Sequence, residues 1–299
     1  MRLVLYIMAA RPQFFPAVVV PVVLGAAAAW HLAGTFSLWL LIPTLLAAVL
    51  YHGGINVIND YFDHLNGTDD INKTPLTPFT GGSRMIQKGL MTPLETLVLG
   101  TVLLTAGSLI GIYLVFICGW PLLLIGLVGL TTGLLYSAPP VFFAGRGLGE
   151  LMVGLNFGVL TVAGSYFVQT GSLRAEIIFI SLPISFLIAA LLYINEFPDY
   201  EADRAAGKRN LVVRLGPERG RWGLVVIVAG AYLSLIVGVL LGLLPPASLI
   251  ALLSLVFAWK GATGLLKDYA GGQRLVPSIK SIIAAHTTAG VLLTLAHII

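Results

Sequence analysis

The amino-acid sequence predicts an all-α integral membrane protein, because of its composition, its long apolar stretches and its one-sided distribution of basic residues. Of its 299 residues, 58% are hydrophobic and 10% are charged, and the mean hydropathy is +0.95. Soluble domains carry about 25% charged residues, so 17 basic and 13 acidic side chains could not cover a soluble fold of this size. A single cysteine, Cys118, excludes a disulfide-rich protein.

The apolar stretches predict the transmembrane helices. A helix needs roughly 20 mainly apolar residues to cross a bilayer, and nine stretches meet this need. They cover residues 14–33, 38–60, 94–117, 120–137, 148–170, 177–197, 222–243, 246–266 and 277–298. No Gly/Ser-rich linker divides the chain, so we expect nine transmembrane helices in a single membrane domain over residues 1–299.

The basic residues predict the orientation in the membrane. All but one of the 17 Lys and Arg lie at the N-terminus, in the longer connections or on adjoining span ends, and Arg174 alone lies on the other side. The positive-inside rule then places the N-terminus and the long loops in the cytoplasm and the C-terminus outside the cell membrane. A secretory signal peptide is the competing interpretation of the N-terminus, but its removal would spoil the agreement between span number and charge.

Acidic residues gather at the end of the second expected span. Asn56, Asp60 and Asp63 are spaced i, i+4 and i+7, which places them on one helical face. The cluster continues to Asp69 and Asp70. Carboxylates near hydrocarbon are costly, so this cluster indicates a functional site.

A second acidic cluster ends the sixth expected span. Asn195, Asp199 and Asp203 are spaced i, i+4 and i+8 and share a face if the helix continues past Pro198, which we expect to kink or locally unwind it. The second and sixth spans run in the same direction, so both clusters emerge at one membrane face. Both also lie at helix C-termini, where the helix dipole favours cations.

The two clusters predict a magnesium site. Oxygen-rich groups without Cys or clustered His suit a hard cation, and Mg²⁺ commonly bridges carboxylates to phosphates. The candidate metal ligands are Asn56, Asn59, Asp60, Asp63, Asp69, Asn195, Asp199 and Asp203.

Basic residues close to both clusters predict an anionic ligand. Lys73 and Arg84 follow the first cluster and Lys208 follows the second, and both side-chain types bind phosphate. Attraction to anionic lipid is the alternative, which fits Arg219 and Arg221 better. Acids and bases at the mouth of a lipid-facing cavity together suggest a lipid diphosphate, with its head held by Mg²⁺, Lys and Arg.

Two further residues near the clusters carry a chemical interpretation. Tyr136, at the cytoplasmic end of the fourth span, would bring an aromatic face or a hydroxyl near the diphosphate, and an aromatic face stabilises a nearby cation. A place in the interfacial aromatic belt explains Tyr136 equally well. His64 lies within the first cluster and is a candidate for proton transfer.

The paired motifs closely resemble those of the UbiA-type intramembrane prenyltransferases. The first reads Asn59-Asp60-Tyr-Phe-Asp63 and the second places Asn195, Asp199 and Asp203 four residues apart. The resemblance covers essentially the whole chain. It implies nine helices around a central cavity capped by cytoplasmic loops, and transfer of a prenyl group from a Mg²⁺-bound polyprenyl diphosphate to an acceptor.

Further segments are similar to one branch, the 1,4-dihydroxy-2-naphthoate polyprenyltransferases of menaquinone biosynthesis. These segments are Arg11-Pro12 and residues 16–25, 80–84, 136–140, 146–150 and 206–211. The first motif departs from the common form because position 67 is Gly and the next carboxylate is Asp69, a spacing that favours this branch. Residues 196–198 replace the Asn-x-Arg often found before the second Asp, which weakens the inference about the acceptor.

The resemblance implies a mechanism with assigned roles. Carboxylate-held Mg²⁺ neutralises the diphosphate, and the allylic cation that remains alkylates 1,4-dihydroxy-2-naphthoate, which loses CO₂ to give a demethylmenaquinone. The implied catalytic residues are Asp63, Asp199, Tyr136 and Lys208. The implied diphosphate-binding residues are Lys73, Arg84, Lys208, Arg146, Asn59 and Asn195.

Two alternatives stay open, and nothing in the sequence points to a nucleic-acid partner. One is a UbiA-type enzyme with another aromatic or lipid acceptor. The other is a cation-coupled transporter, since acidic residues on broken helices also mark ion pathways. Transporters usually place the ion near the bilayer midplane between inverted repeats, whereas both clusters here run in the same direction at one face.

Overall fold

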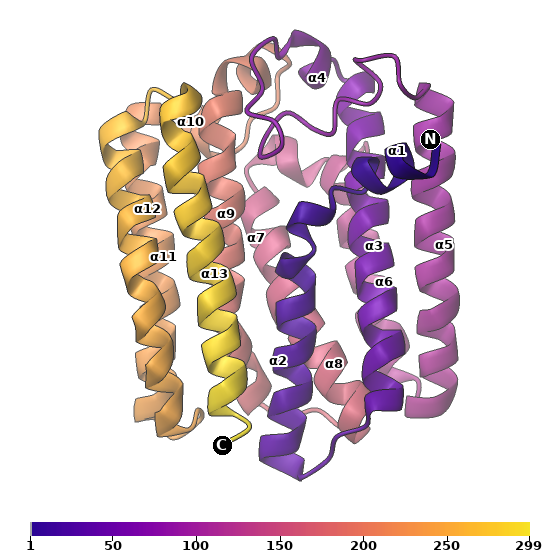
Figure 1. The fold of residues 1–299 in the computed structure, drawn as a ribbon, viewed down its shortest axis with the longest axis vertical. Helices are drawn as coiled ribbons and strands as arrows, with labels where there is room; N and C mark the ends of the chain where they lie inside the picture. The colour runs from indigo at the N-terminus through magenta and orange to yellow at the C-terminus, as the bar shows by residue number, and fades with distance from the viewer. Residues whose placement is uncertain (1) are drawn as a thin grey trace.

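Every regular element of the described chain is a helix (Figure 1). The computed structural model describes residues 2–299, and Met1, the first residue of the expected domain, lies outside the described residues. Six spans are formed mainly by single helices, namely α2 (Pro16–Ala33), α3 (Leu38–Leu65), α5 (Pro93–Cys118), α9 (Glu176–Ala205), α11 (Pro217–Leu240) and α13 (Val276–Ala296). Two spans are composite: α7 (Gly149–Val153), the π-helical segment η3 (Gly154–Leu160) and α8 (Thr161–Thr170) form one, and η4 (Pro246–Ser254) with α12 (Leu255–Asp268) forms the other.

These eight segments of residues 2–299 are long and apolar enough to cross a membrane. The protein is therefore a multi-pass membrane protein, as the composition predicts. The ninth expected span is α6 (Pro121–Ser137), which is apolar but only 17 residues long. At 1.5 Å per residue it extends about 26 Å, slightly less than the hydrocarbon core of about 30 Å. The ninth crossing thus stays a prediction.

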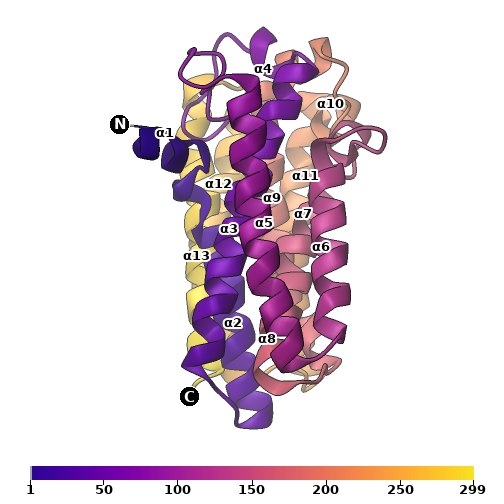
Figure 2. The ribbon, with the colours of Figure 1, turned by 90° about the vertical axis from the view of Figure 1, so that its right-hand side faces the viewer.

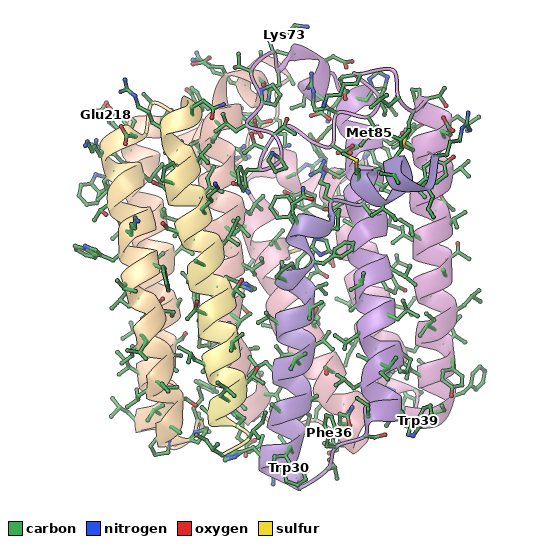
Figure 3. All side chains as sticks on the ribbon, in the orientation of Figure 1. Trp30, Phe36, Trp39, Lys73, Met85 and Glu218 are labelled. Carbon is green, nitrogen blue, oxygen red and sulfur yellow. The ribbon has the colours of Figure 1, made fainter. Side chains whose placement is uncertain are left out.

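The long helices run side by side along the long axis of the molecule (Figures 1 and 2). The short helices α4 (Thr68–Ile71) and α10 (Leu211–Leu215) lie with the long connections at one end of the bundle, here called the loop end, and the C-terminus lies at the other. Helix α1 (Arg2–Ala9) lies across the bundle near the loop end, against α3. Lys73 and Glu218 mark the loop end, and Trp30 and Trp39 mark the opposite end (Figure 3).

The main apolar core surrounds α9. This helix packs against α11, α13 and η3, and Ile184 and Ile194 on it are fully buried. The hydroxyl of Tyr193 donates a hydrogen bond of 2.6 Å to the carbonyl of Gly220 on α11. Because neighbouring helices enclose most of α9, its rotation about its own axis is fixed, and so is the direction in which its acidic face points.

The structure corrects the expected ends and break of the two acidic helices. Both α3 and α9 continue past residues 60 and 197, so the acidic motifs lie mostly inside helices. The local unwinding expected at Pro198 is wrong, because α9 stays helical through Ala205. Proline is tolerated in membrane helices where neighbours satisfy the freed backbone groups. The irregular helix is instead η3, where a Cβ on Gly158 would lie 1.8 Å from Ser185 Oγ.

Candidate active site

A cavity of about 380 Å³ lies beneath the connections at the loop end. Residues from α2, α3, α6, η3 and α9 line it, and residues 79–82 of the connection after α4 cover it. Charged and amide side chains line the covered end, whereas the deeper wall is mainly apolar, with Val18, Ile125, Leu130 and Leu160 among its residues. The cavity thus joins a polar head site to an apolar chamber.

The first motif is anchored by Arg11, which directly precedes the short helix η1 (Pro12–Phe14). The Arg11 guanidinium forms an ion pair with the Asp60 carboxylate, and both side chains are largely buried. The backbone N–H of Ser83 donates a 3.1 Å hydrogen bond to Asp60 Oδ2. Asp60 therefore lies behind the cavity wall, whereas Asp63, one turn further along α3, lines the cavity.

Lys208 joins the two motifs. Its Nζ lies 3.6 Å from Asp63 Oδ2 on α3 and 3.6 Å from Asp203 Oδ1 on α9. Burial alone lowers the pKa of Lys208, but the attraction of Asp203 and Asp63 outweighs it and holds this pKa well above its usual range. Lys208 is therefore a fixed positive charge between the two carboxylates.

Asp199 of the second motif is held by neutral donors. Asn72 Nδ2 donates a 2.8 Å hydrogen bond to Asp199 Oδ1, and the backbone N–H of Gly81 donates one of 3.2 Å to Oδ2. Gly81 and Gly82 have φ angles of 72° and 75°, a conformation that glycine adopts without strain. A Cβ on Gly82 would lie 2.7 Å from Asp69 Oδ2, so only glycine lets this loop approach the carboxylates.

Asp69 is the least neutralised carboxylate of the first motif. It is buried, and its Oδ2 has no hydrogen-bond partner in residues 2–299. Burial, followed by the charge of Asp63, raises the pKa of Asp69 to about 7, against the opposing pull of Arg11 and Lys208. Arg84 donates to the backbone carbonyl of Asp69 and not to its carboxylate, so the Asp69 side chain is left open to a further cation.

The three asparagines of the motifs all line the cavity. Asn56 Nδ2 donates to the carbonyl of Ala10 at 3.2 Å, and Asn59 Nδ2 donates to Ser137 Oγ at 2.6 Å. Asn195 Oδ1 is buried without a hydrogen-bond partner in the described part of the chain. Tyr136 lines the same wall, so the structure brings most candidate residues to one chamber.

Besides Asp60, four further candidate residues lie outside the cavity lining. Lys73 is exposed and donates to the carbonyl of Asp70, and Arg146 is exposed and donates to the carbonyl of Pro140. His64 lies 3.0 Å from Asp70. Arg84, described above, is the fourth. Contact of these residues with a diphosphate, or proton transfer by His64, would need a movement of the connections and stays a prediction.

The donor set of the two motifs fits Mg²⁺. Among residues 2–299, no three Asp, Glu, His or Cys side chains converge closely enough to hold an ion between them as they stand, and Lys208 lies between two of the carboxylates. The unpartnered oxygens of Asp69 and Asn195 are hard donors without competing Cys ligands. Carboxylates from both motifs would hold the ion once Lys208 turned to a diphosphate.

Comparison with known proteins identifies the family. The sequence pattern of the UbiA prenyltransferase family matches residues 18–274. The chain belongs to this family. Membership favours prenyl transfer over cation transport among the functions that the sequence leaves open.

Relatives cover most of the chain. It is 28% identical to the 1,4-dihydroxy-2-naphthoate octaprenyltransferase of Bacillus subtilis (strain 168), over 97% of this chain and 90% of that protein. It is 30% identical to the protein of the same name from Mycobacterium tuberculosis (strain ATCC 25618 / H37Rv), over 92% and 90% of the two chains. A solved UbiA homologue from Archaeoglobus fulgidus bound to GPP and Mg²⁺ shares the fold, with a TM-score of 0.68, 18% identity, and coverage of 95% and 99%.

Sequence reasoning missed several residues of this UbiA-type site. The sequence indicates Arg11 only through the similarity of its segment to the family, and the motif spacing does not mark Asn72 or His52 as site residues. His52 lies one turn before Asn56 on the same face of α3 and lines the cavity, so extending the polar face backwards would have found it. Asn210 caps α10 and donates a 2.7 Å hydrogen bond to Asp203, a contact between neighbouring segments that spacing alone does not reveal.

Proposed function

We propose that this UbiA-type protein transfers a polyprenyl group from a polyprenyl diphosphate to 1,4-dihydroxy-2-naphthoate. Diphosphate and CO₂ are released, and the product is a demethylmenaquinol, the reduced form of a demethylmenaquinone. The observation that carries the proposal is a single chamber with acidic motifs of α3 and α9 at its covered end and an apolar wall below. The names of two relatives that align with nearly the whole chain support the acceptor.

The covered end would bind the diphosphate. Mg²⁺, when bound by the two motifs, neutralises the diphosphate and makes it a better leaving group. Lys208 is placed to donate to the same oxygens, because it stands between Asp63 and Asp203. A positive charge fixed where negative charge develops stabilises the transition state without reorganisation.

The deeper chamber would hold the prenyl chain and the aromatic ring away from water. Gly129, Leu130 and Leu160 line this part, and apolar walls suit an isoprenoid tail. Exclusion of water matters, since water would capture an allylic cation before the ring does. Tyr136, on the wall near the motifs, is placed to stabilise that cation with its ring face.

The bonding changes follow from the acceptor. As the carbon–oxygen bond to the diphosphate breaks, its electron pair leaves with the diphosphate. A ring electron pair of the naphthoate forms the new carbon–carbon bond at the carboxylated carbon. Loss of the carboxylate as CO₂ then returns an electron pair to the ring and restores its aromaticity, so no external oxidant or reductant is needed.

Product analysis tests the proposal. The purified protein with Mg²⁺, a polyprenyl diphosphate and 1,4-dihydroxy-2-naphthoate should release about one CO₂ per diphosphate, as the balance above requires, and 4-hydroxybenzoate should be a poor acceptor in the same assay. A carboxylated product, or a preference for 4-hydroxybenzoate, would overturn the acceptor. Membership of the family would stand in either case.

We also propose that the loop end faces the cytoplasm of a cell-membrane protein and that the C-terminus lies outside. The basic residues at the loop end support this orientation. A topology reporter inserted near Gly207 should report the cytoplasm, and one fused after Ile299 should report the other side. Reporters on the same side would contradict both the orientation and the ninth crossing by α6.

A further inference from the structure

A polar side chain without a partner lies in the deeper, mainly apolar part of the cavity. His52 lines the chamber and is 7% exposed. Its Nδ1 is buried and has no hydrogen-bond partner among residues 2–299. A buried polar group without a partner is costly, so His52 calls for a ligand or a structural explanation.

Packing holds the imidazole in a defined orientation. The Phe157 ring of η3 lies 4.7 Å from it at 68°, and the Phe15 ring before α2 lies 5.8 Å from it at 57°. Three separate elements therefore fix the ring. The π-helical turn of η3, a feature that often occurs at functional sites, supplies one of the two flanking rings.

The other polar side chains of this deeper wall already have partners within the protein. Tyr51 shares a 2.9 Å hydrogen bond with Ser108. Thr132 donates to Asn156 at 2.9 Å, and Asn156 donates to the carbonyl of Met152 at 2.8 Å. His52 thus differs from its neighbours in keeping its hydrogen-bonding capacity unused.

The ring geometry indicates which nitrogen would act. Nδ1 is buried and has no hydrogen-bond partner within the described chain. In proteins a buried N–H donor without a partner is rarer than a buried acceptor without one. The proton therefore belongs on Nε2, which is left to donate toward the chamber. Its ligand must offer an oxygen lone pair.

The depth of His52 indicates which part of a ligand it meets. His52, Asn56, Asn59 and Asp63 all line the cavity from one face of α3. At 1.5 Å per residue, His52 lies about 16 Å below Asp63 along the helix axis. That is too deep for the diphosphate, and a hydrocarbon tail could not satisfy an imidazole N–H.

We propose that His52 Nε2 donates a hydrogen bond to the acceptor hydroxyl that lies farther from the reacting carbon. In 1,4-dihydroxy-2-naphthoate this is the 4-hydroxyl, since the 1-hydroxyl is adjacent to the carboxylated carbon. His52 is then a specificity-determining residue for the aromatic substrate, between the Phe15 and Phe157 rings. The inference rests on the proposed function, and it adds the contact that selects the acceptor.

The test combines variants of the protein with variants of the ligand. Dissociation constants of 1,4-dihydroxy-2-naphthoate and of 1-hydroxy-2-naphthoate are measured by calorimetry in detergent with Mg²⁺ and inorganic pyrophosphate present. His52→Phe keeps an aromatic ring but removes the donor, and should weaken binding of the dihydroxy ligand about tenfold. The wild type should prefer the dihydroxy ligand over the monohydroxy one, and His52→Phe should bind both alike. Removing the imidazole and removing the 4-hydroxyl delete the same contact, so the coupling between these two changes measures that contact.

Two matched variants sharpen the result. His52→Gln keeps an amide donor close to the Nε2 position and should restore most of the preference for the dihydroxy ligand. Tyr51→Phe removes a neighbouring hydroxyl that is already bonded to Ser108, and should leave the preference unchanged. The KM for the polyprenyl diphosphate should stay the same in all three variants, because His52 lies about 16 Å from Asp63 along the axis of α3.

The possible failures are distinguishable. If His52→Phe keeps the preference, or loses affinity for the polyprenyl diphosphate to the same extent, the inference is overturned and His52 has a structural role, while the proposed function stands. A wild-type protein that neither binds nor prenylates 1,4-dihydroxy-2-naphthoate would overturn the inference and the proposed function together.

Discussion

The two acidic motifs face the same cavity, but different groups neutralise them. In the first motif, the Arg11 guanidinium pairs with Asp60, and a second guanidinium, that of Arg84, binds the backbone beside Asp69. These cations come from the N-terminal segment and from the connection after α4. The first motif therefore has two cations of its own nearby, although only Asp60 is directly paired with one of them and the Asp69 carboxylate stays open.

The second motif relies on neutral donors and on one cation. Asn72 and the Gly81 N–H donate hydrogen bonds to Asp199. The Asp203 carboxylate accepts a hydrogen bond from Asn210 and lies beside the Lys208 ammonium group. Since Lys208 also lies beside Asp63, it is the positive charge that the two motifs share. The difference indicates that the second motif depends more strongly on Lys208 and on a bound metal ion.

Removal of one carboxylate charge from each motif should give the largest effect. Asp63→Asn and Asp199→Asn keep the side-chain shape but weaken a proposed metal ligand, and we expect kcat/KM to fall about 10³-fold or more in each, since metal stabilisation of a leaving group is worth several kcal/mol. Asp199→Asn should also need more Mg²⁺ for half-maximal activity than Asp63→Asn, because the second motif has fewer cations of its own. Steady-state kinetics with Mg²⁺ titrations measure both quantities.

Glu176→Gln is the matched control for these variants, because Glu176 begins α9 at the opposite end of the same helix. It should retain wild-type activity. Full activity in either aspartate variant would show that the motif concerned does not take part in the mechanism. Equal Mg²⁺ requirements in the two variants would contradict the proposed difference between the motifs.

Replacement of the shared cation should have an intermediate effect. Lys208→Met removes the charge but keeps a long side chain, and we expect about a 10²-fold loss of kcat/KM, similar to the loss of one preorganised donor from an active site. Lys208→Arg should recover part of the loss, since it restores the charge with a different geometry. A Lys208→Met variant with normal kcat and a raised Mg²⁺ affinity would show instead that Lys208 only balances the empty site.

Spacing and charge were enough to predict the fold class and the pairing of the motifs. The i, i+4 and i+7 spacing on α3 and the same direction of the second and sixth spans bring Asp63 and Asp203 to one residue, Lys208. Long apolar stretches predict membrane helices well because burial in lipid is decided by composition along the sequence. Composition alone does not decide whether the short α6 crosses the membrane, because that also depends on the local membrane thickness.

Contacts between distant segments could not be predicted in the same way. The ion pair of Arg11 with Asp60 and the bond of Asn72 to Asp199 depend on how an N-terminal segment and a long connection fold over the bundle. The regularity of α9 at Pro198 also depends on its neighbours, because helix α9 is enclosed by packing that a local propensity rule does not include. Periodicity predicts which residues share a face, and tertiary packing decides what covers that face.

The smallest expected effect tests the neutral link between the motifs. Asn72 follows α4, in the connection after the first motif, is buried, and donates a 2.8 Å hydrogen bond to Asp199 of the second. In Asn72→Ala that bond is lost, but Asp199 keeps the Gly81 N–H, so we expect KM for the polyprenyl diphosphate to rise only about three- to tenfold, with little change in kcat. Half-buried Gln87 donates a hydrogen bond to the exposed Asp70, away from the cavity, so Gln87→Ala is the control and should match the wild type. If Asn72→Ala lost as much activity as Asp199→Asn, the position of the connection, and not the charge of Asp199, would limit the second motif.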